Sequence, residues 1–146
     1  MKMTAEESYD IRSVSRNLTY TPQNWPADLK ADLYIPSKDG LLPVVITIHG
    51  GSWSGRSRTD MTSVAEKLAE RGYAVFNISY RFAPAYTYPA QLHDVQQALR
   101  WIDNNADRYN FDRKRISTWG YSSGAHLAAL VAGFESSEFQ LPAIRS

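Results

Sequence analysis

The feature that most constrains this chain is one serine between two glycines, in the run Gly120-Tyr121-Ser122-Ser123-Gly124. Residues 115–119 have the composition of a short β-strand, and residues 125–132 form an apolar, alanine-rich run typical of a buried helix. A strand that turns this sharply into a helix strains the residue at the turn, and side chains two positions away would collide. We therefore expect Ser122 to stand exposed at the positive end of the helix. The alternative is a small-residue turn into a core helix, without chemistry.

A second glycine motif, residues 49–53 (His-Gly-Gly-Ser-Trp), follows directly after a buried strand. Acyl transfer develops negative charge on a carbonyl oxygen, and backbone N–H groups aimed at that oxygen stabilise it by about 3 kcal/mol each. Glycines allow the backbone to approach a substrate closely, so we predict an oxyanion hole formed by the amides of Gly50, Gly51 and Ser123. The alternative is an ordinary glycine turn.

The order of apolar patterns predicts one α/β domain over residues 1–146. Residues 11–20 read as an edge strand, and residues 29–35 alternate as a half-buried strand with one wet face, so the two suit an antiparallel hairpin. Further strands and helices are then expected to alternate in right-handed βαβ units around a mostly parallel sheet with helices on both faces. The expected segments are strands at 44–48, 74–80 and 115–119, helices at 61–69 and 89–102, and a polar loop at 104–112.

Composition excludes several classes of function. The net charge of +1 argues against a nucleic-acid binder, and the absence of cysteine excludes disulfides and thiolate metal sites. No dinucleotide-binding glycine pattern and no cluster of metal ligands is visible, so we expect neither a cofactor nor a metal. The apolar runs are too short for a membrane span, and residues 1–7 lack the apolar region of a signal peptide, which predicts a cytoplasmic location.

Residues 43–130 resemble the α/β-hydrolase superfamily, and more narrowly the small carboxylesterases of the hormone-sensitive-lipase-like and feruloyl-esterase-like groups. The resemblance implies that Ser122 is the nucleophile and that Gly50, Gly51 and Ser123 form the oxyanion hole. Ser52 stands where many relatives have a third glycine. The matching stretches are residues 49–53, 71–75, 79–81 and 88–95, Trp101, residues 111–112 and residues 120–127.

The triad histidine and acid of this fold should follow the nucleophile in the sequence. No aspartate occurs after Ser122, and His126 lies one helical turn further on, where a structural role is expected. The resemblance implies that His49 holds the oxyanion loop. We expect His93 to point outward or to pack, Asp94 to be structural, and Asp112 to be a turn residue.

The chain therefore resembles the N-terminal half of a hydrolase, with the C-terminal half absent. Residues 142–145 look like the start of a further strand, which would leave the strand before Ser122 without a neighbour at the sheet edge. We hypothesise a truncation, a cleaved product, or a two-chain enzyme whose second chain carries the C-terminal half.

The leading functional hypothesis is a serine carboxylesterase that forms an acyl-enzyme with a small-molecule ester. An arylformamidase-like amidase would use the same groups. A non-catalytic fragment that binds a ligand or partner is the alternative from another class. Trp53 and Tyr121 are candidates for the substrate pocket. Other aromatic residues could also line it, although packing is the more frequent role of such side chains: Phe82, Tyr86 and Tyr88.

Overall fold

A computed structural model provides the structure of the chain. It describes residues 8–50, 57–81, 85–86, 89–120, 124–125, 128 and 144–145. In these residues a mixed sheet has the strand order β1-β2-β4-β3-β5-β6. The strands are β1 (Ile11–Thr19), β2 (Lys30–Pro36), β3 (Leu42–Ile48), β4 (Ala74–Ile78), β5 (Phe111–Gly120) and β6 (Ile144–Arg145). The pairs β1–β2 and β2–β4 are antiparallel, and the remaining pairs are parallel.

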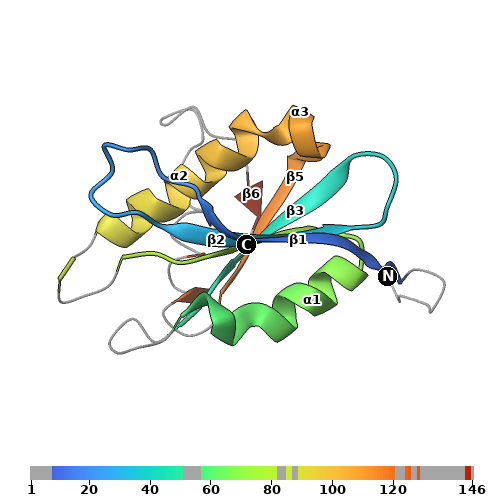
Figure 1. Cartoon of the computed structure of the whole chain (residues 1–146), viewed down its shortest axis with the longest axis horizontal. Coiled ribbons are helices and arrows are strands. Elements are labelled where there is room, and N and C mark those ends of the chain that lie inside the picture. Colours follow the sequence, from blue (N-terminus) through green and yellow to red (C-terminus); the bar gives the residue numbers. More distant parts are fainter. Residues whose placement is uncertain are drawn as a thin grey trace.

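Helices cover both faces of this sheet, as Figure 1 shows. The 3-10 helix η2 (Arg58–Met61) leads into α1 (Thr62–Glu70), which lies on one face. Helices α2 (Ala90–Asn104) and α3 (Ala106–Tyr109) lie on the other. The strand and helix alternation predicted from the sequence is thus confirmed, with a parallel centre and an antiparallel hairpin at one edge.

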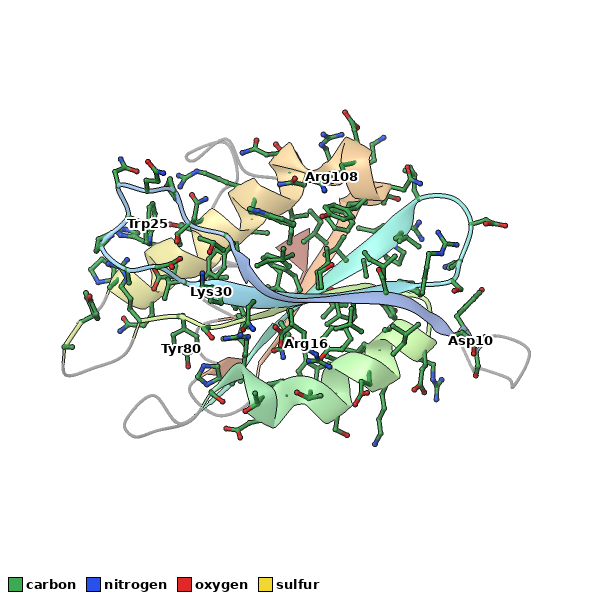
Figure 2. The ribbon with its side chains drawn as sticks, viewed as in Figure 1. Asp10, Arg16, Trp25, Lys30, Tyr80 and Arg108 are labelled. Atoms are coloured by element: carbon green, nitrogen blue, oxygen red, sulfur yellow. The ribbon has the colours of Figure 1, made fainter. Side chains whose placement is uncertain are left out.

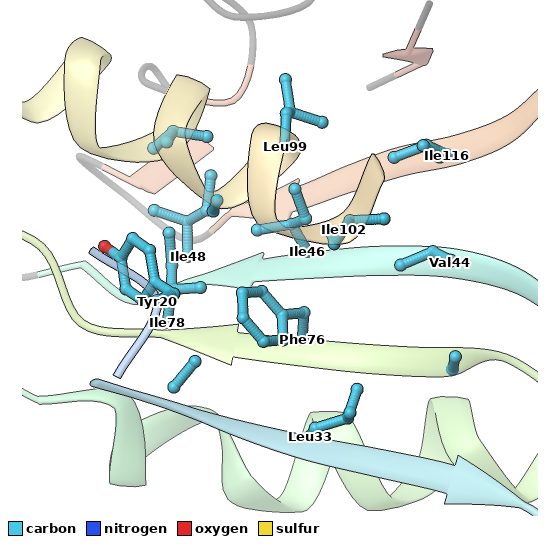
Figure 3. Packing of buried hydrophobic residues seen from close by; sticks show 14 of the residues in the cluster. Tyr20, Leu33, Val44, Ile46, Ile48, Phe76, Ile78, Leu99, Ile102 and Ile116 are labelled. Atoms are coloured by element: carbon cyan, nitrogen blue, oxygen red, sulfur yellow. The ribbon is translucent and has the colours of Figure 1, made fainter. Parts of the chain in front are cut away.

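The main hydrophobic core lies between the sheet and α2 (Figure 3). Alternate residues of β3 point into it, because successive side chains of a strand face opposite sides of a sheet. A smaller cluster under α1 contains Tyr34, Ala65, Ala69 and Val75. Both faces of the central strands are therefore buried, which explains their nearly continuous apolar sequences. The labelled members of the main core are Tyr20, Leu33, Val44, Ile46, Ile48, Phe76, Ile78, Leu99, Ile102 and Ile116.

The prediction of one wet face on β2 is wrong. Asp32 is 3% exposed and Tyr34 is fully buried, although both lie on the face that alternation assigns to solvent. Tyr34 packs with the alanines of α1, and the Asp32 carboxylate forms ion pairs with two arginines. The aspartate in this strand is therefore part of a buried ion-pair cluster and does not mark a solvent-exposed face.

Two further expectations are corrected near β5. The segment predicted as a polar loop at 104–112 contains helix α3, which ends where Asn110 adopts a left-handed conformation at φ 59°. The strand β5 also has a neighbour, because Ile116 and Ser117 pair with Ile144 and Arg145 of β6. The expectation of an unpartnered edge at β5 is therefore wrong, whereas the strand predicted around residues 142–145 is confirmed at two of its residues.

Candidate active site

The two glycine motifs leave the sheet side by side. Strands β3 and β5 are parallel neighbours, and Ile48, the last residue of β3, pairs with Gly120, the last residue of β5. His49 and Gly50 follow the first strand, and the segment with Ser122 follows the second. Because both segments leave the sheet at the same level of the same edge, the topology brings together the two regions that the sequence assigns to one site.

The glycines that flank the serine are packed against backbone. A Cβ added to Gly120 would lie 2.1 Å from the carbonyl oxygen of Gly124. A Cβ added to Gly124 would lie 2.1 Å from the oxygen of Ile48 and 2.7 Å from that of His49. The expected collision of side chains at these positions is confirmed. The backbone at Gly124 therefore packs directly against the end of β3, and only glycine fits at this position.

Most of the predicted site residues lie outside the described residues. Tyr121, Ser122 and Ser123 fall in one such segment, and Gly51 and Trp53 in another. Gly50 is described and is buried at the end of β3. Its neighbour His49 contacts the start of the helix after Ser122 through its carbonyl oxygen, as given above.

His49 is a buried histidine directly after β3, at the start of the first glycine motif. Its ring stacks on Tyr80 with 4.7 Å between centroids, and the Tyr80 hydroxyl donates to the His49 carbonyl oxygen at 2.7 Å. The Nδ1 atom lies 2.8 Å from the Gly50 oxygen, and because a carbonyl only accepts, Nδ1 carries the proton. Burial lowers the pKa of the imidazole, which favours its neutral form. His49 is therefore fixed between Tyr80 and Gly50, and its expected role of holding the oxyanion loop stays a prediction.

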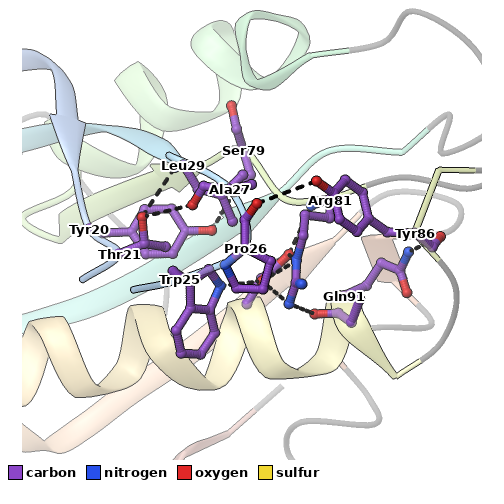
Figure 4. A network of polar contacts seen from close by, with 12 residues as sticks. Tyr20, Thr21, Trp25, Pro26, Ala27, Leu29, Ser79, Arg81, Tyr86 and Gln91 are labelled. Carbon is purple, nitrogen blue, oxygen red and sulfur yellow. Dashed lines mark hydrogen bonds and ion pairs between the residues drawn. The ribbon is translucent and has the colours of Figure 1, made fainter. Parts of the chain in front are cut away.

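A buried ion pair secures the segment that follows β4 at this same edge (Figure 4). Asp94 of α2 accepts from the Arg81 backbone N–H at 2.9 Å and lies 2.8 Å from the guanidinium Nη2. The Trp25 indole donates to the same carboxylate at 2.9 Å. The Arg81 guanidinium carbon lies over the rings of Trp25 and Tyr86, at 5.8 and 5.3 Å from their centroids. Asp94 is thus structural, and Tyr86 packs on Arg81.

The remaining described candidates for acid–base chemistry have structural or surface positions. His93 is exposed on α2. The Asp112 carboxylate accepts from the Lys114 backbone N–H at 2.9 Å and pairs with Arg115 at 2.7 Å, and the first of these bonds is the main reason that its pKa is lowered. His126, Phe82 and Tyr88 lie outside the described residues. Within the described ranges no group of three His, Cys, Asp or Glu side chains is placed to hold a metal ion.

Sequence reasoning gave no role to two arginines at this edge, Arg81, which pairs with Asp94, and Arg58, which pairs with Asp32. The signal for Arg81 was its place directly after a buried strand, ahead of a helix that carries an aspartate.

No helix among the described residues is both long and apolar enough to cross a membrane.

Comparison with known proteins places the chain in a family. The BD-FAE family model matches residues 31–142, which include both glycine motifs. This chain belongs to the BD-FAE family. The BD-FAE chain is 37% identical to Esterase LipC of Mycobacterium tuberculosis over 102 residues, which are 69% of this chain and 25% of that protein. It is 35% identical to the isoprenylcysteine alpha-carbonyl methylesterase ICME of Arabidopsis thaliana over 119 residues, 81% of this chain and 27% of that protein.

A solved structure with the same fold is the Bacterial Heroin Esterase, with a TM-score of 0.79 and 27% sequence identity. The similarity covers 91% of this chain and 43% of that one. The resemblance to α/β-hydrolase carboxylesterases is thus confirmed, and the BD-FAE chain spans about a quarter of the length of the curated relatives.

Proposed function

We propose that this protein is a serine carboxylic-ester hydrolase that acts through an acyl-enzyme on Ser122. The observation that carries the proposal is the pairing of Ile48 with Gly120, which brings the two glycine motifs to one point of the sheet edge. The packed glycines at positions 120 and 124 support it, because they match a tight turn that presents a serine.

In the proposed reaction the Ser122 hydroxyl oxygen attacks the ester carbonyl carbon, and its proton passes to a histidine base. The carbonyl oxygen becomes an oxyanion and accepts hydrogen bonds from the amides of Gly50, Gly51 and Ser123. The C–O bond to the alcohol then breaks, and the alcohol leaves with the proton from the histidine. Water attacks the acyl-enzyme in the same way and releases the acid.

The histidine and its orienting acid would come from sequence outside these 146 residues, because in this fold both follow the nucleophile. His49 is buried against Tyr80, and His93 is exposed on α2, so neither described histidine fits the role. Whether those residues belong to the same polypeptide or to a second chain does not change the mechanism, and the comparisons give no support to a second chain.

The substrate class is a small-molecule ester, with Trp53 and Tyr121 as the candidate pocket residues. The names of the relatives, an esterase and a methylesterase, favour an ester over the amide of an arylformamidase-like reaction. They also favour catalysis over a non-catalytic binding role.

Labelling of the complete protein with a fluorophosphonate tests the proposal. We expect stoichiometric modification that is lost in Ser122→Ala and kept in Ser117→Ala, a control on the adjoining strand β5. Hydrolysis of a p-nitrophenyl ester should follow the labelling, and an N-formyl arylamine should react more slowly. A folded wild-type protein that is neither labelled nor active would contradict the proposal.

A further inference from the structure

A row of buried polar side chains crosses the sheet one residue before the site. Asp32 of β2, Asn77 of β4 and Thr47 of β3 are neighbours in register. Their exposed fractions are 3%, 0% and 0%, so all three are shielded from water. The Thr47 hydroxyl donates to the Asn77 amide oxygen at 2.8 Å. Buried polar groups need hydrogen-bond or ion-pair partners, because leaving them unpaired costs free energy, and Asp32 and the Asn77 amide nitrogen still require one.

The partner of this row is Arg58, the first residue of η2. Its Nε lies 3.2 Å from an Asp32 carboxylate oxygen, and its carbonyl oxygen accepts from the Asn77 side-chain amide at 2.8 Å. A second guanidinium nitrogen donates to the Ser79 hydroxyl at 2.8 Å, and a third donates to the Asn17 side chain. One arginine therefore binds β1, β2, β4 and the segment after β4. Its side chain is only 16% exposed, so solvent screens these contacts weakly.

Arg58 lies where the chain returns to the sheet from the first glycine motif. The chain leaves β3 after Ile48, and Ser57 caps η2 with a side chain that accepts from the Thr59 N–H. Only residues 51–56 separate Gly50 from Ser57. At the departing end, His49 is fixed by Tyr80. At the returning end, the fixed point is Arg58. The two ends are also joined through described residues, because Arg58 donates to the Ser79 hydroxyl and the next residue, Tyr80, donates to the His49 carbonyl oxygen.

We propose that Arg58 is a positioning residue for the reaction at Ser122: its ion pair with Asp32 and its bonds to β1 and β4 set the placement of the Gly50 amide. The inference rests on the function proposed above. Arg58 touches no reacting atom, and it acts through Ser79 and Tyr80, which hold His49 directly before Gly50. Because the energy of an oxyanion hole depends on donor placement, loosening this contact slows the chemical step without removing any donor.

Arg16 offers a matched control. It lies on the α1 side of the sheet (Figure 2), 3.7 Å from the other oxygen of the same Asp32 carboxylate. Its side chain is 56% exposed, and its ring contact is with Tyr34 of β2. Replacing Arg16 removes the same charge from beside the same acid, but Arg16 belongs to β1 and not to the end of the loop.

The experiment counts competent sites in the complete protein by fluorophosphonate titration, and then measures kcat per site and KM on a p-nitrophenyl ester. We expect Arg58→Lys, which keeps a cation beside Asp32, to lower kcat per site about tenfold, and Arg58→Gln to lower it about a hundredfold. KM should change less than about threefold, and Arg16→Gln should change kcat less than about twofold.

The titration separates positioning from stability. A merely structural arginine would reduce the number of titratable sites and leave kcat per site unchanged in both Arg58 variants, and that result would overturn the inference. Equal losses of kcat per site in Arg58→Lys and Arg16→Gln would also overturn it, because charge alone would then explain them. If the wild-type protein is neither labelled nor active, the proposed function fails first and this inference falls with it.

Discussion

At the scale of single residues, the closest contacts of the candidate site are made by glycines. Gly124 lies so near the end of β3 that a Cβ would stand 2.1 Å from a backbone oxygen, and neither backbone can move without disturbing the pairing of β3 with β5. Gly40 is the opposite case, since its φ is +82° but nothing lies within 4 Å of an added Cβ. One glycine is required for space, and the other for its backbone conformation.

The two glycines should therefore respond differently to alanine. We expect Gly124→Ala to lower the free energy of unfolding by about 3 kcal/mol through overpacking, and to abolish labelling of Ser122. Gly40→Ala should cost only about 1 kcal/mol, the price of a left-handed residue, with labelling intact. Chemical denaturation and fluorophosphonate labelling measure both effects. Equal stability and labelling of the two variants would contradict the tight packing at Gly124.

Two buried tyrosines make a second contrast. Among the described residues the Tyr34 hydroxyl has no hydrogen-bond partner, although the side chain is fully buried. The Tyr80 hydroxyl donates to the His49 carbonyl oxygen. Removing a buried unpaired hydroxyl relieves a desolvation cost, so we expect Tyr34→Phe to raise the free energy of unfolding by up to about 1 kcal/mol. Tyr80→Phe should lower it by about 1 to 2 kcal/mol, because an acceptor loses its partner. Thermal denaturation distinguishes the two signs.

His49 predicts a dependence of stability on pH. Burial lowers the pKa of its imidazole in the folded protein, whereas an unfolded histidine has a pKa of about 6.5. Below that pH the unfolded chain binds a proton that the folded protein resists, so this contribution is fully present above pH 6.5 and is lost as pH falls. The slope reaches at most about 1.4 kcal/mol per pH unit.

Urea denaturation between about pH 7.5 and about pH 5.5, roughly one unit on either side of the unfolded pKa, measures the slope. We expect His49→Gln to reduce the loss of stability on acidification. His93→Gln, which changes an exposed histidine, should keep it. If the wild-type and His49→Gln slopes coincide, His49 does not contribute in the way described.

At the scale of elements, buried ions connect segments that hydrophobic packing alone would leave loosely joined. Asp94 joins α2 to the segment after β4 and, through Trp25, to the segment before β2. Asp32 joins β2 to η2 and to the backbone of Asn17 in β1. Each carboxylate is nearly or fully buried, so removing one partner leaves a charge without compensation.

Asp94→Asn should therefore lower the free energy of unfolding by about 3 to 5 kcal/mol, since it leaves the Arg81 guanidinium buried and unpaired. Asp103→Asn, which breaks an exposed pair with Arg113, should change it by less than about 1 kcal/mol. Denaturant midpoints at constant slope give both values. A loss at position 94 as small as that at position 103 would show that water reaches the first pair.

The elements that the sequence predicts well are those whose apolar pattern, a continuous run or a helical repeat, extends over enough residues to be recognised. The strands around Val44 and Phe76 and the helix with Leu92 and Leu99 are confirmed for this reason. Helix α3 has only four residues, so no period can reveal it. Asp32 was misread because its cation, Arg58, is distant in the sequence, and local alternation assigns an isolated aspartate to solvent.

The candidate site shows the same contrast. Its two glycine motifs are local signals, and the sequence places each of them after a strand, whereas the structure shows that these two strands are neighbours. The arginines that secure those ends are not local signals, because each is recognised only from the strands that it meets in three dimensions. The roles assigned to residues 51, 53 and 121–123 stay predictions, since these residues lie outside the described part of the chain.

At the scale of the whole molecule, the position of the site follows from the strand order. From β3 the chain crosses by α1 to β4 on one side, and from β4 it crosses by α2 to β5 on the other side of β3. The direction of the strand order therefore reverses beside β3, and ligands of open α/β sheets bind at the carboxyl ends of the strands at such a reversal. The right-handed sense of both crossovers puts α1 and α2 on opposite faces, as observed in Figure 1.

The strand order also predicts which backbone amides exchange most slowly with deuterium. Residues 42–48 of β3 are bonded to strands on both sides and are almost all buried. In contrast, β1 pairs with β2 alone among the described strands, its register shifts twice, and all of its residues are exposed or half-buried. The free energy of local opening rises toward the core of a fold. Among β1, β2, β3 and β4, peptides from β3 and β4 should therefore exchange slowest and peptides from β1 fastest.

One amide of β1 should depart from this trend. The Asn17 N–H donates to the buried Asp32 carboxylate at 3.0 Å, and we expect it to exchange more slowly than its neighbours in residues 11–16. In Asp32→Ala that protection should disappear, while the protection of β3 remains. Residue-resolved exchange by NMR measures both. Slow exchange along all of β1 would instead mean that this edge is covered in solution, and protection at Asn17 that survives Asp32→Ala would show that its amide is held by something other than the carboxylate.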